Sequence, residues 1–397
     1  MAAPTITMPF PARLSSPLAI DGVILTLGLT LLLGGLVILA SASISTADSS
    51  LGDPFFYVKR QVIAALLGGA GAFVCLHIPM AVWRSVGPLL LLLGLALLIV
   101  VLLPGVGYTV NGSTRWLRVG FMNLQVSEPA RLCLILYMAG YLVRRAKAVR
   151  EGFGGFLRPM ILLSIACVLL LREPDFGAAI VLLATVLTML FVAGARLRDF
   201  CLFFGAAVIA MAALAITSPY RLQRVTAFLD PWADPYNSGF QLTQSLIAIG
   251  RGEWFGVGLG NGVQKLFYLP EAHTDFVFAV YAEEFGLVGA VILICLFLAL
   301  LWRIFALAVR AARSEQLFEA YLAVGIGTWL GLQAFINVGV NMGILPTKGL
   351  TLPLISYGRS SLIITMVALG LLLRIHHELV TDAPPANRSA PRKGRRS

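Results

Sequence analysis

Long apolar runs separated by short polar connections are the dominant pattern along the chain. Each run is close to the ~20 residues that a helix needs to cross a bilayer. The pattern predicts ten transmembrane helices, at residues 20–43, 61–79, 86–103, 129–143, 159–171, 176–194, 200–217, 276–302, 318–342 and 358–374. The fourth, fifth and last runs are short, so their ends are the least well defined. We therefore expect an all-α polytopic membrane protein.

Composition supports a membrane protein and excludes several other classes. Hydrophobic residues make up 58% of the 397 residues and charged residues 12%, a balance that a water-soluble core could not bury. The five cysteines are scattered inside apolar runs, which indicates neither a disulfide framework nor a metal site. The net charge of +11 lies largely in short connections and the C-terminal tail, where membrane orientation accounts for it without a nucleic-acid partner.

The distribution of lysine and arginine predicts that both termini are cytoplasmic. Connections on the inner side are then short and basic, and those on the outer side are long and chemically varied. We expect a cytoplasmic N-terminus (1–19), a ten-helix membrane domain (20–374) and a basic, disordered cytoplasmic tail (375–397). A large structured periplasmic loop, 218–275, joins helices seven and eight. Apolar residues at helical spacing predict a short interfacial helix at 240–250 within it.

Charged side chains gather where the eighth helix is expected to begin, in LPEAHTDFVFAVYAEEFG at 269–286. Glu271, His273 and Asp275 precede two phenylalanines that would keep water from one side. A carboxylate in such surroundings has its pKa raised toward that of a general base. The simpler interpretation is that Thr274 caps the helix and Asp275 interacts with the helix dipole from the first turn.

Glu283 and Glu284 follow eight and nine residues after Asp275, which places them deeper along the same helix. Ionisable side chains at such a depth are costly, so a functional role is one hypothesis. Ion pairing or helix packing is the other.

Other outer connections add positive charge. The stretch 111–132 contains Arg115, and the stretch 345–362 contains Lys348, Ser356 and Arg359. Any one of these cations could simply contact lipid headgroups. Several cations converging with a carboxylate favour an anionic substrate that carries phosphate.

Five motifs, in this order, resemble those of the SEDS family (shape, elongation, division and sporulation). They are NGSTRWLRVG, VSEPARL, EPDFGAAIVLL, GLGNGVQKLFYLPEAHTDFVFAVYAEEFG and NMGILPTKGLTLPLISYGRSSL. The match runs from the first predicted helix to the tenth, and KLFYLPEAHTDF resembles the cell-division branch more than the elongation branch. The chain departs from the family's pattern at Arg131, where lysine is usual, and at Arg359, where glycine is common.

The resemblance implies an inner-membrane glycosyltransferase that polymerises lipid II into glycan strands for the division septum. The family's essential acid falls on Asp275, which would act as general base for the acceptor hydroxyl. Cations among Arg115, Lys265, Lys348 and Arg359, with or without a divalent cation (Mg²⁺ or Mn²⁺), would receive the undecaprenyl pyrophosphate.

The resemblance also implies further contacts and partners. Glu271, His273 and Ser356 join the candidate substrate-binding residues, and His273 is a candidate either to orient Asp275 or to contact substrate. The family works with a class B penicillin-binding protein, an FtsI-like transpeptidase, and in division with FtsQ, FtsL and FtsB.

Two other classes of function remain open from the sequence. A lipid II flippase would use the same lipid-linked substrate, but transporters commonly bind at the bilayer midplane between internal repeats, and no repeat is evident. Glu283 and Glu284 are the feature that favours transport. A non-enzymatic division scaffold would have no need of a carboxylate–histidine cluster beside lipid.

Overall fold

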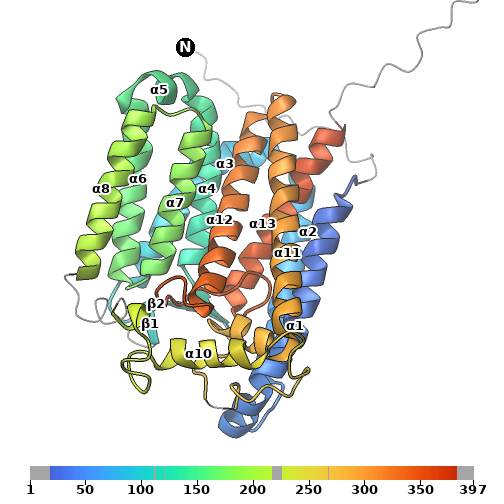
Figure 1. The fold of residues 1–397 in the computed structure, drawn as a ribbon. Coiled ribbons are helices and arrows are strands. Elements are labelled where there is room, and N and C mark those ends of the chain that lie inside the picture. The colour runs from blue at the N-terminus through green and yellow to red at the C-terminus, as the bar shows by residue number, and fades with distance from the viewer. Residues whose placement is uncertain (1–17, 111–112, 121, 217–225, 267, 382–397) are drawn as a thin grey trace, which may run out of the picture.

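The structure is a computed structural model that describes residues 18–381 apart from 111–112, 121, 217–225 and 267. A bundle of long helices dominates it (Figure 1). The helices are α1 (Gly22–Leu51), α2 (Phe56–His77), α3 (Met80–Val101), α4 (Ser127–Arg144), α5 (Ala146–Glu151), α6 (Phe153–Arg172), α7 (Phe176–Val192), α8 (Leu197–Ile216), α10 (Phe240–Arg251), α11 (Val277–Arg313), α12 (Leu317–Asn341) and α13 (Arg359–Thr381). The strands are β1 (Gly107–Val110), β2 (Ser113–Val119) and β3 (Met122–Gln125).

Each predicted apolar run coincides with a helix, so the all-α membrane fold is confirmed. Within the described part of the chain, 7 helices are long and apolar enough to cross a membrane, namely α1, α2, α3, α6, α11, α12 and α13. Helix α7 is apolar but shorter. The fold is that of a multi-pass membrane protein, and the number of ten spans stays a prediction.

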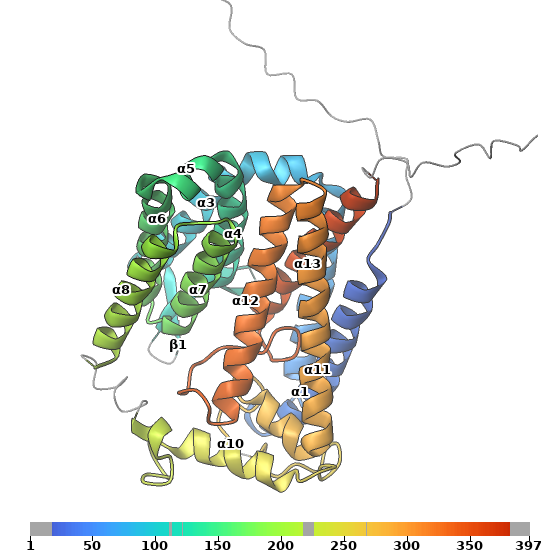
Figure 2. The ribbon, with the colours of Figure 1, turned by 45° about the horizontal axis from the view of Figure 1, so that its top comes forward.

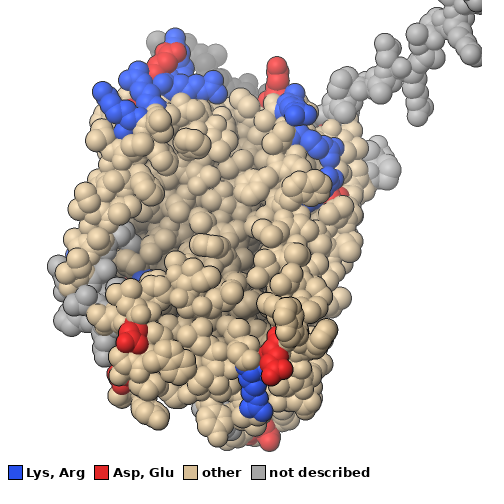
Figure 3. All heavy atoms as spheres, viewed as in Figure 1, with Lys and Arg blue, Asp and Glu red and all other residues tan. Residues whose placement is uncertain are grey.

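The surface suits a lipid environment. Large apolar side chains point outward along the helices, with Leu66 of α2 70% exposed and Ile209 of α8 71% exposed. On the face shown in Figure 3, lysine, arginine and acidic side chains gather at the two ends, and the broad band between them is nearly free of charge. Hydrocarbon can cover such a band without stranding polar groups.

The long connections gather at one end of the bundle. The strands, α10 and the connection between α12 and α13 lie there, and the basic helix α5 lies at the opposite end (Figures 1 and 2). We call the first of these the loop end. The sequence predicted this separation of long, varied connections from short, basic ones.

Two local predictions on the outer side have different outcomes. The short helix expected at 240–250 is present as α10, which lies across the loop end of the bundle (Figure 1). The connection before α4 was expected only as a loop, but it forms an antiparallel sheet in the order β1-β2-β3. The Asn-Gly dipeptide at 111–112 is a hairpin signal in the sequence that could have predicted it.

The last helix continues beyond the predicted end of the membrane domain. Helix α13 continues to Thr381, so residues 375–381 are helical and the predicted tail boundary falls inside a helix. Ion pairing helps to hold this last part, because Arg374 and Glu378 are 2.8 Å apart. The rest of the predicted tail, and residues 1–17 of the predicted N-terminal segment, lie outside the described residues.

Helix α11 is interrupted at Gly286, where the backbone is not helical. Its φ of 65° and ψ of −167° define a backbone conformation that essentially only glycine adopts. The break frees backbone groups that a continuous helix would pair, and the segment 253–258 pairs them instead. The four bonds are Val257 N to Glu283 O (3.0 Å), Gly258 N to Glu284 O (3.1 Å), Leu287 N to Glu253 O (2.9 Å) and Val288 N to Trp254 O (3.1 Å). The large outer loop is therefore fastened into the helix that follows it.

Candidate active site around Asp275

Asp275 is positioned through its backbone carbonyl by two asparagines of α12. Asn337 donates to this carbonyl at 2.9 Å and Asn341 at 3.0 Å. The side-chain oxygen of Asn341 also accepts the Ala279 N–H at 3.0 Å, in the first turn of α11. Helix α12 thus caps α11 and fixes the residue before it, and both asparagines are buried.

The capping role expected of Thr274 is wrong. Helix α11 begins at Val277, and its first turn contains no acidic residue. The Thr274 hydroxyl donates to the Glu271 carboxylate at 2.7 Å instead. Asp275 therefore precedes the helix. The simpler interpretation, in which its carboxylate interacts with the helix dipole from the first turn, does not apply.

The Asp275 side chain faces the connection between α12 and α13. A β-carbon on Gly349 would lie 3.0 Å from Oδ2 of Asp275, so the carboxylate lies close to the backbone of this connection. Asp275 is half-buried, and Phe276 next to it is buried at 3% exposure. A half-buried carboxylate beside an apolar neighbour and a loop is suited to taking a proton from a bound hydroxyl.

His273 belongs to an aromatic cluster beside Asp275. Its ring lies 4.4 Å from that of Tyr57 on α2 and 5.8 Å from that of Tyr357, measured between centroids. The Tyr357 N–H donates to the His273 carbonyl at 2.9 Å. Burial lowers the pKa of His273, against the opposing charge of Glu271, so the imidazole is favoured in its neutral form. His273 therefore fits an orienting role better than that of a cation.

The other candidate substrate residues divide into two groups. Lys348 and Arg359 lie on the connection that faces Asp275 or at its end, and the Lys348 ammonium lies 3.9 Å over the ring of Phe176. Ser356 is in the same connection, but it is buried and its hydroxyl accepts the Leu352 N–H at 2.8 Å, which closes a turn. Ser356 therefore stabilises this connection rather than presenting its hydroxyl to a substrate.

Lys265 is buried away from this cluster in an ion pair. Its ammonium lies 2.6 Å from the Glu284 carboxylate and 2.7 Å from the Ser41 hydroxyl of α1. Glu283 accepts the N–H groups of Val263 and Gln264 at 2.9 and 3.2 Å. The two deep glutamates therefore hold the outer loop against α11 and α1, in agreement with the ion-pairing hypothesis for them.

Arg115 belongs to a second polar cluster, which lies between the sheet, α4 and the turn before α7. Its guanidinium lies 3.8 Å from the Asp175 carboxylate. Burial, and then the charge of Asp175, raises the pKa of Glu173 to about 8 against the opposing charge of Arg115. Glu173 is fully buried, and neither carboxylate oxygen has a hydrogen-bond partner among the described residues.

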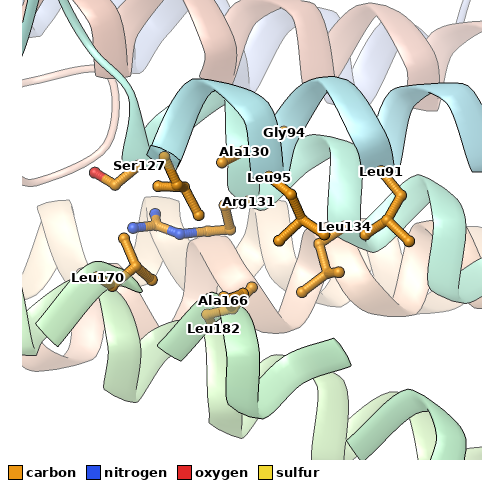
Figure 4. Close-up of a pocket in the computed structure, with 11 residues that line it drawn as sticks. Leu91, Gly94, Leu95, Ser127, Ala130, Arg131, Leu134, Ala166, Leu170 and Leu182 are labelled. Atoms are coloured by element: carbon orange, nitrogen blue, oxygen red, sulfur yellow. The ribbon is translucent and has the colours of Figure 1, made fainter. Parts of the chain in front are cut away.

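Arg131 extends this second cluster into the bundle. It is 2% exposed. Its guanidinium donates to the side-chain oxygen of Gln333 on α12 at 3.1 Å and forms an ion pair with Glu128 at 3.5 Å. A cavity of about 10 Å³, enough for about one water molecule, lies beside it between α3, α4, α6 and α7 (Figure 4). Because Gln333 also donates to Thr351 at 3.0 and 3.3 Å, this cluster adjoins the connection that faces Asp275.

Sequence reasoning missed the residues of α12 that organise the site. Gln333, Asn337 and Asn341 recur every fourth residue in an otherwise apolar segment, which places them on one face of a helix. That spacing was the available signal. The described residues contain no group of three acidic, histidine or cysteine side chains that could hold an ion, and a role for a divalent cation stays a prediction.

Comparison with known proteins defines the family. A model of the FtsW, RodA and SpoVE family, described as "Cell cycle protein", matches residues 22–381, nearly the whole chain. The chain belongs to this family.

Curated relatives within the family are named "Probable peptidoglycan glycosyltransferase FtsW". The protein of Thioalkalivibrio sulfidiphilus is 62% identical over 91% of this chain and 90% of its own length. That of Coxiella burnetii is 54% identical over 90% of this chain and 96% of its own length. The resemblance to the SEDS family and to its division branch is thus confirmed.

Two solved structures share the fold. One comes from work described as "Structural coordination of polymerization and crosslinking by a peptidoglycan synthase complex". It has a TM-score of 0.74 and 34% identity, and the match covers 91% of this chain and 99% of that one. The rod shape determining protein RodA of Thermus thermophilus has a TM-score of 0.67 and 31% identity, over 91% and 98% of the two chains.

Proposed function

We propose that the chain is a peptidoglycan glycosyltransferase that polymerises lipid II into glycan strands during septal cell-wall synthesis. The relatives' shared name supports this reaction. The observation that carries the proposal is the placement of Asp275, a half-buried carboxylate fixed by Asn337 and Asn341 and faced by a connection that contains Lys348.

The reaction needs one base and one site for the leaving group. Asp275 takes the proton of the acceptor 4-hydroxyl as its oxygen attacks the anomeric carbon of the donor sugar. The bond from that carbon to the pyrophosphate oxygen breaks, and undecaprenyl pyrophosphate leaves with the bonding electrons. His273, neutral and packed between tyrosines, orients the loop that carries the base.

Cations near the base stabilise the departing negative charge. Lys348 and Arg359 are the candidates that lie on or beside the connection facing Asp275. Arg115 and Lys265 are engaged with carboxylates elsewhere, so the proposal gives them structural roles. A divalent cation, if one takes part, would be held by Asp275 together with the substrate's own phosphates.

The proposal includes a location and partners. The loop end faces the periplasm of the bacterial inner membrane at the division septum, with both termini in the cytoplasm. A class B penicillin-binding protein, FtsI-like, supplies crosslinking, and FtsQ, FtsL and FtsB join in division. For a partner in crosslinking, the support is the similar chain from work on a peptidoglycan synthase complex.

Neither alternative function gains a specific observation. Glu283 and Glu284 were the argument for a flippase, and both are engaged in holding the outer loop. A scaffold would have no need to hold a carboxylate against an open connection.

The test is polymerisation of purified lipid II by the purified chain, together with its cognate penicillin-binding protein, followed by gel analysis of the glycan. We expect strands of many disaccharides. If no polymer forms, but fluorescent lipid II crosses vesicles containing the chain, the proposal is wrong and the flippase is correct.

A further inference from the structure

Two arginines from different helices converge on one tyrosine at the loop end. Arg60 lies in the second turn of α2, and Arg359 is the first residue of α13. Burial raises the pKa of the Tyr357 phenol, and the charges of Arg359 and Arg60 both oppose that rise. Gln61, next to Arg60, bonds to Ser356 and to Gly358, which directly precedes Arg359, so the two arginines flank the same junction of α2 and α13.

Neither arginine has an acidic partner. Among the described residues, no carboxylate lies within 4.0 Å of Arg60 or Arg359. Lys59, the neighbour of Arg60, is by contrast paired with Asp53 at 3.0 Å. Two like charges held near each other without a counter-charge repel, and a bound anion would offset this cost.

The surroundings hold the two arginines in place. The Arg60 guanidinium lies 4.0 Å over the ring of Phe56. The next residue, Gln61, is buried, donates to the Ser356 carbonyl at 3.0 Å and accepts the Gly358 N–H at 3.3 Å. Helix α2 is thus fastened to the turn that leads into Arg359.

An aromatic platform links this pair to the candidate base. Tyr57 packs against Tyr357 at 4.9 Å and against His273 at 4.4 Å between ring centroids. Asp275 follows His273 by two residues.

We propose that Arg60 and Arg359 form the subsite for the pyrophosphate of the lipid-linked sugar donor. Guanidinium forks match phosphate oxygens in pairs, and two forks suit a diphosphate better than one phosphate. This inference rests on the proposed function. It selects Arg359 from the four candidate cations and adds Arg60, which sequence reasoning did not consider.

The headgroup phosphate of an ordinary bilayer lipid shares this chemistry. A headgroup site would not distinguish a diphosphate from a monophosphate, whereas the proposed subsite binds the diphosphate more tightly. The test must therefore compare both probes.

The experiment measures binding of undecaprenyl pyrophosphate and of undecaprenyl phosphate to the full chain in phosphatidylcholine nanodiscs. We expect Arg60→Gln and Arg359→Gln each to weaken pyrophosphate binding about 10-fold, the loss of one charge-assisted contact. Arg60→Lys should lose less, because it keeps the charge but not the fork. Lys59→Gln is the matched control, with binding within about 2-fold of the wild type.

Two results would overturn the proposal: equal behaviour of Arg60→Gln and Lys59→Gln, or an equal loss for both lipid probes, which would indicate a headgroup site. Binding is measured without turnover, so the outcome is independent of whether the chain polymerises lipid II. Where it does, Arg60→Gln should lower kcat/KM for lipid II, because the subsite would hold the pyrophosphate both in the bound substrate and as it departs.

Discussion

Two asparagine side chains explain the position of the candidate base, because they bond to its backbone. Asn341 acts on both sides, as an acceptor for the Ala279 N–H and a donor to the Asp275 carbonyl. The sequence predicted the carboxylate but not the pair that holds it, because a bond between residues 66 positions apart depends on how α11 and α12 pack.

Replacing Asn341 with aspartate separates capping from positioning. The new carboxylate can still accept the Ala279 N–H, so α11 should keep its cap, but it cannot donate to the Asp275 carbonyl. We expect kcat for polymerisation to fall about 10- to 100-fold, since small misplacements of a catalytic group have effects of this size. KM should change little. The melting temperature should fall as well, because Asn341 is buried and a carboxylate there loses both of its donated bonds. Activity is therefore measured at a temperature where the variant stays folded, and an unchanged kcat there would contradict the positioning role.

The buried carboxyl of Glu173 makes stability depend on pH. Its pKa of about 8 means that the folded chain keeps this proton at pH values where the unfolded chain, with an ordinary pKa near 4.5, has lost it. Stability is therefore lost as pH rises through this window. Glu173→Gln cannot ionise, so its melting temperature should exceed that of the wild type by a margin that grows between pH 5 and 9. Parallel curves would contradict this, and exposed Glu151→Gln is the control.

At the scale of elements, the break in α11 joins the largest loop to the bundle. The sequence predicted both the loop and the helix as separate units. It did not predict that segment 253–258 would complete the helix at Gly286, because the exchanged backbone bonds leave no trace in hydrophobic periodicity. The sheet was missed for a related reason, since its strands are too short and polar to stand out beside the membrane helices.

Gly286→Ala should disrupt this junction. A β-carbon there would lie 2.4 Å from the Gly256 N, in a backbone conformation that L-residues rarely adopt. We expect a loss of at least ~1–3 kcal/mol from backbone strain alone, seen as a lower melting temperature. Gly250→Ala in α10 is the control, because its β-carbon would meet open space and alanine favours the helix by ~1 kcal/mol. Equal melting temperatures for the two variants would contradict the account.

At the scale of the whole molecule, the apolar runs were sufficient to predict the long helices of the bundle and which connections lie at the same end. It could not place Lys265 or Arg115, because the choice between binding substrate and pairing with a buried carboxylate depends on the tertiary fold. The sequence therefore predicted the residues around Asp275, but it did not predict which of the candidate cations lie near them.

The predicted orientation is tested by cysteine labelling in intact spheroplasts. Tyr236 in the outer loop is 85% exposed, and the Lys147 side chain in α5 is 85% exposed at the opposite end. A membrane-impermeant maleimide should label Tyr236→Cys in intact spheroplasts and Lys147→Cys only after permeabilisation. Labelling of the parent chain sets the background from its five native cysteines. The reverse pattern would place the loop end in the cytoplasm.

The most direct test of the central claim is polymerisation of lipid II by Asp275→Asn in complex with its penicillin-binding protein. Asparagine keeps the size of the side chain and the backbone carbonyl that Asn337 and Asn341 hold, but it cannot take a proton. The account predicts an intact complex that forms no polymer, whereas Asp234→Asn, in the same outer loop, should polymerise normally. Polymer formation by Asp275→Asn at the wild-type rate would show that Asp275 is not the base.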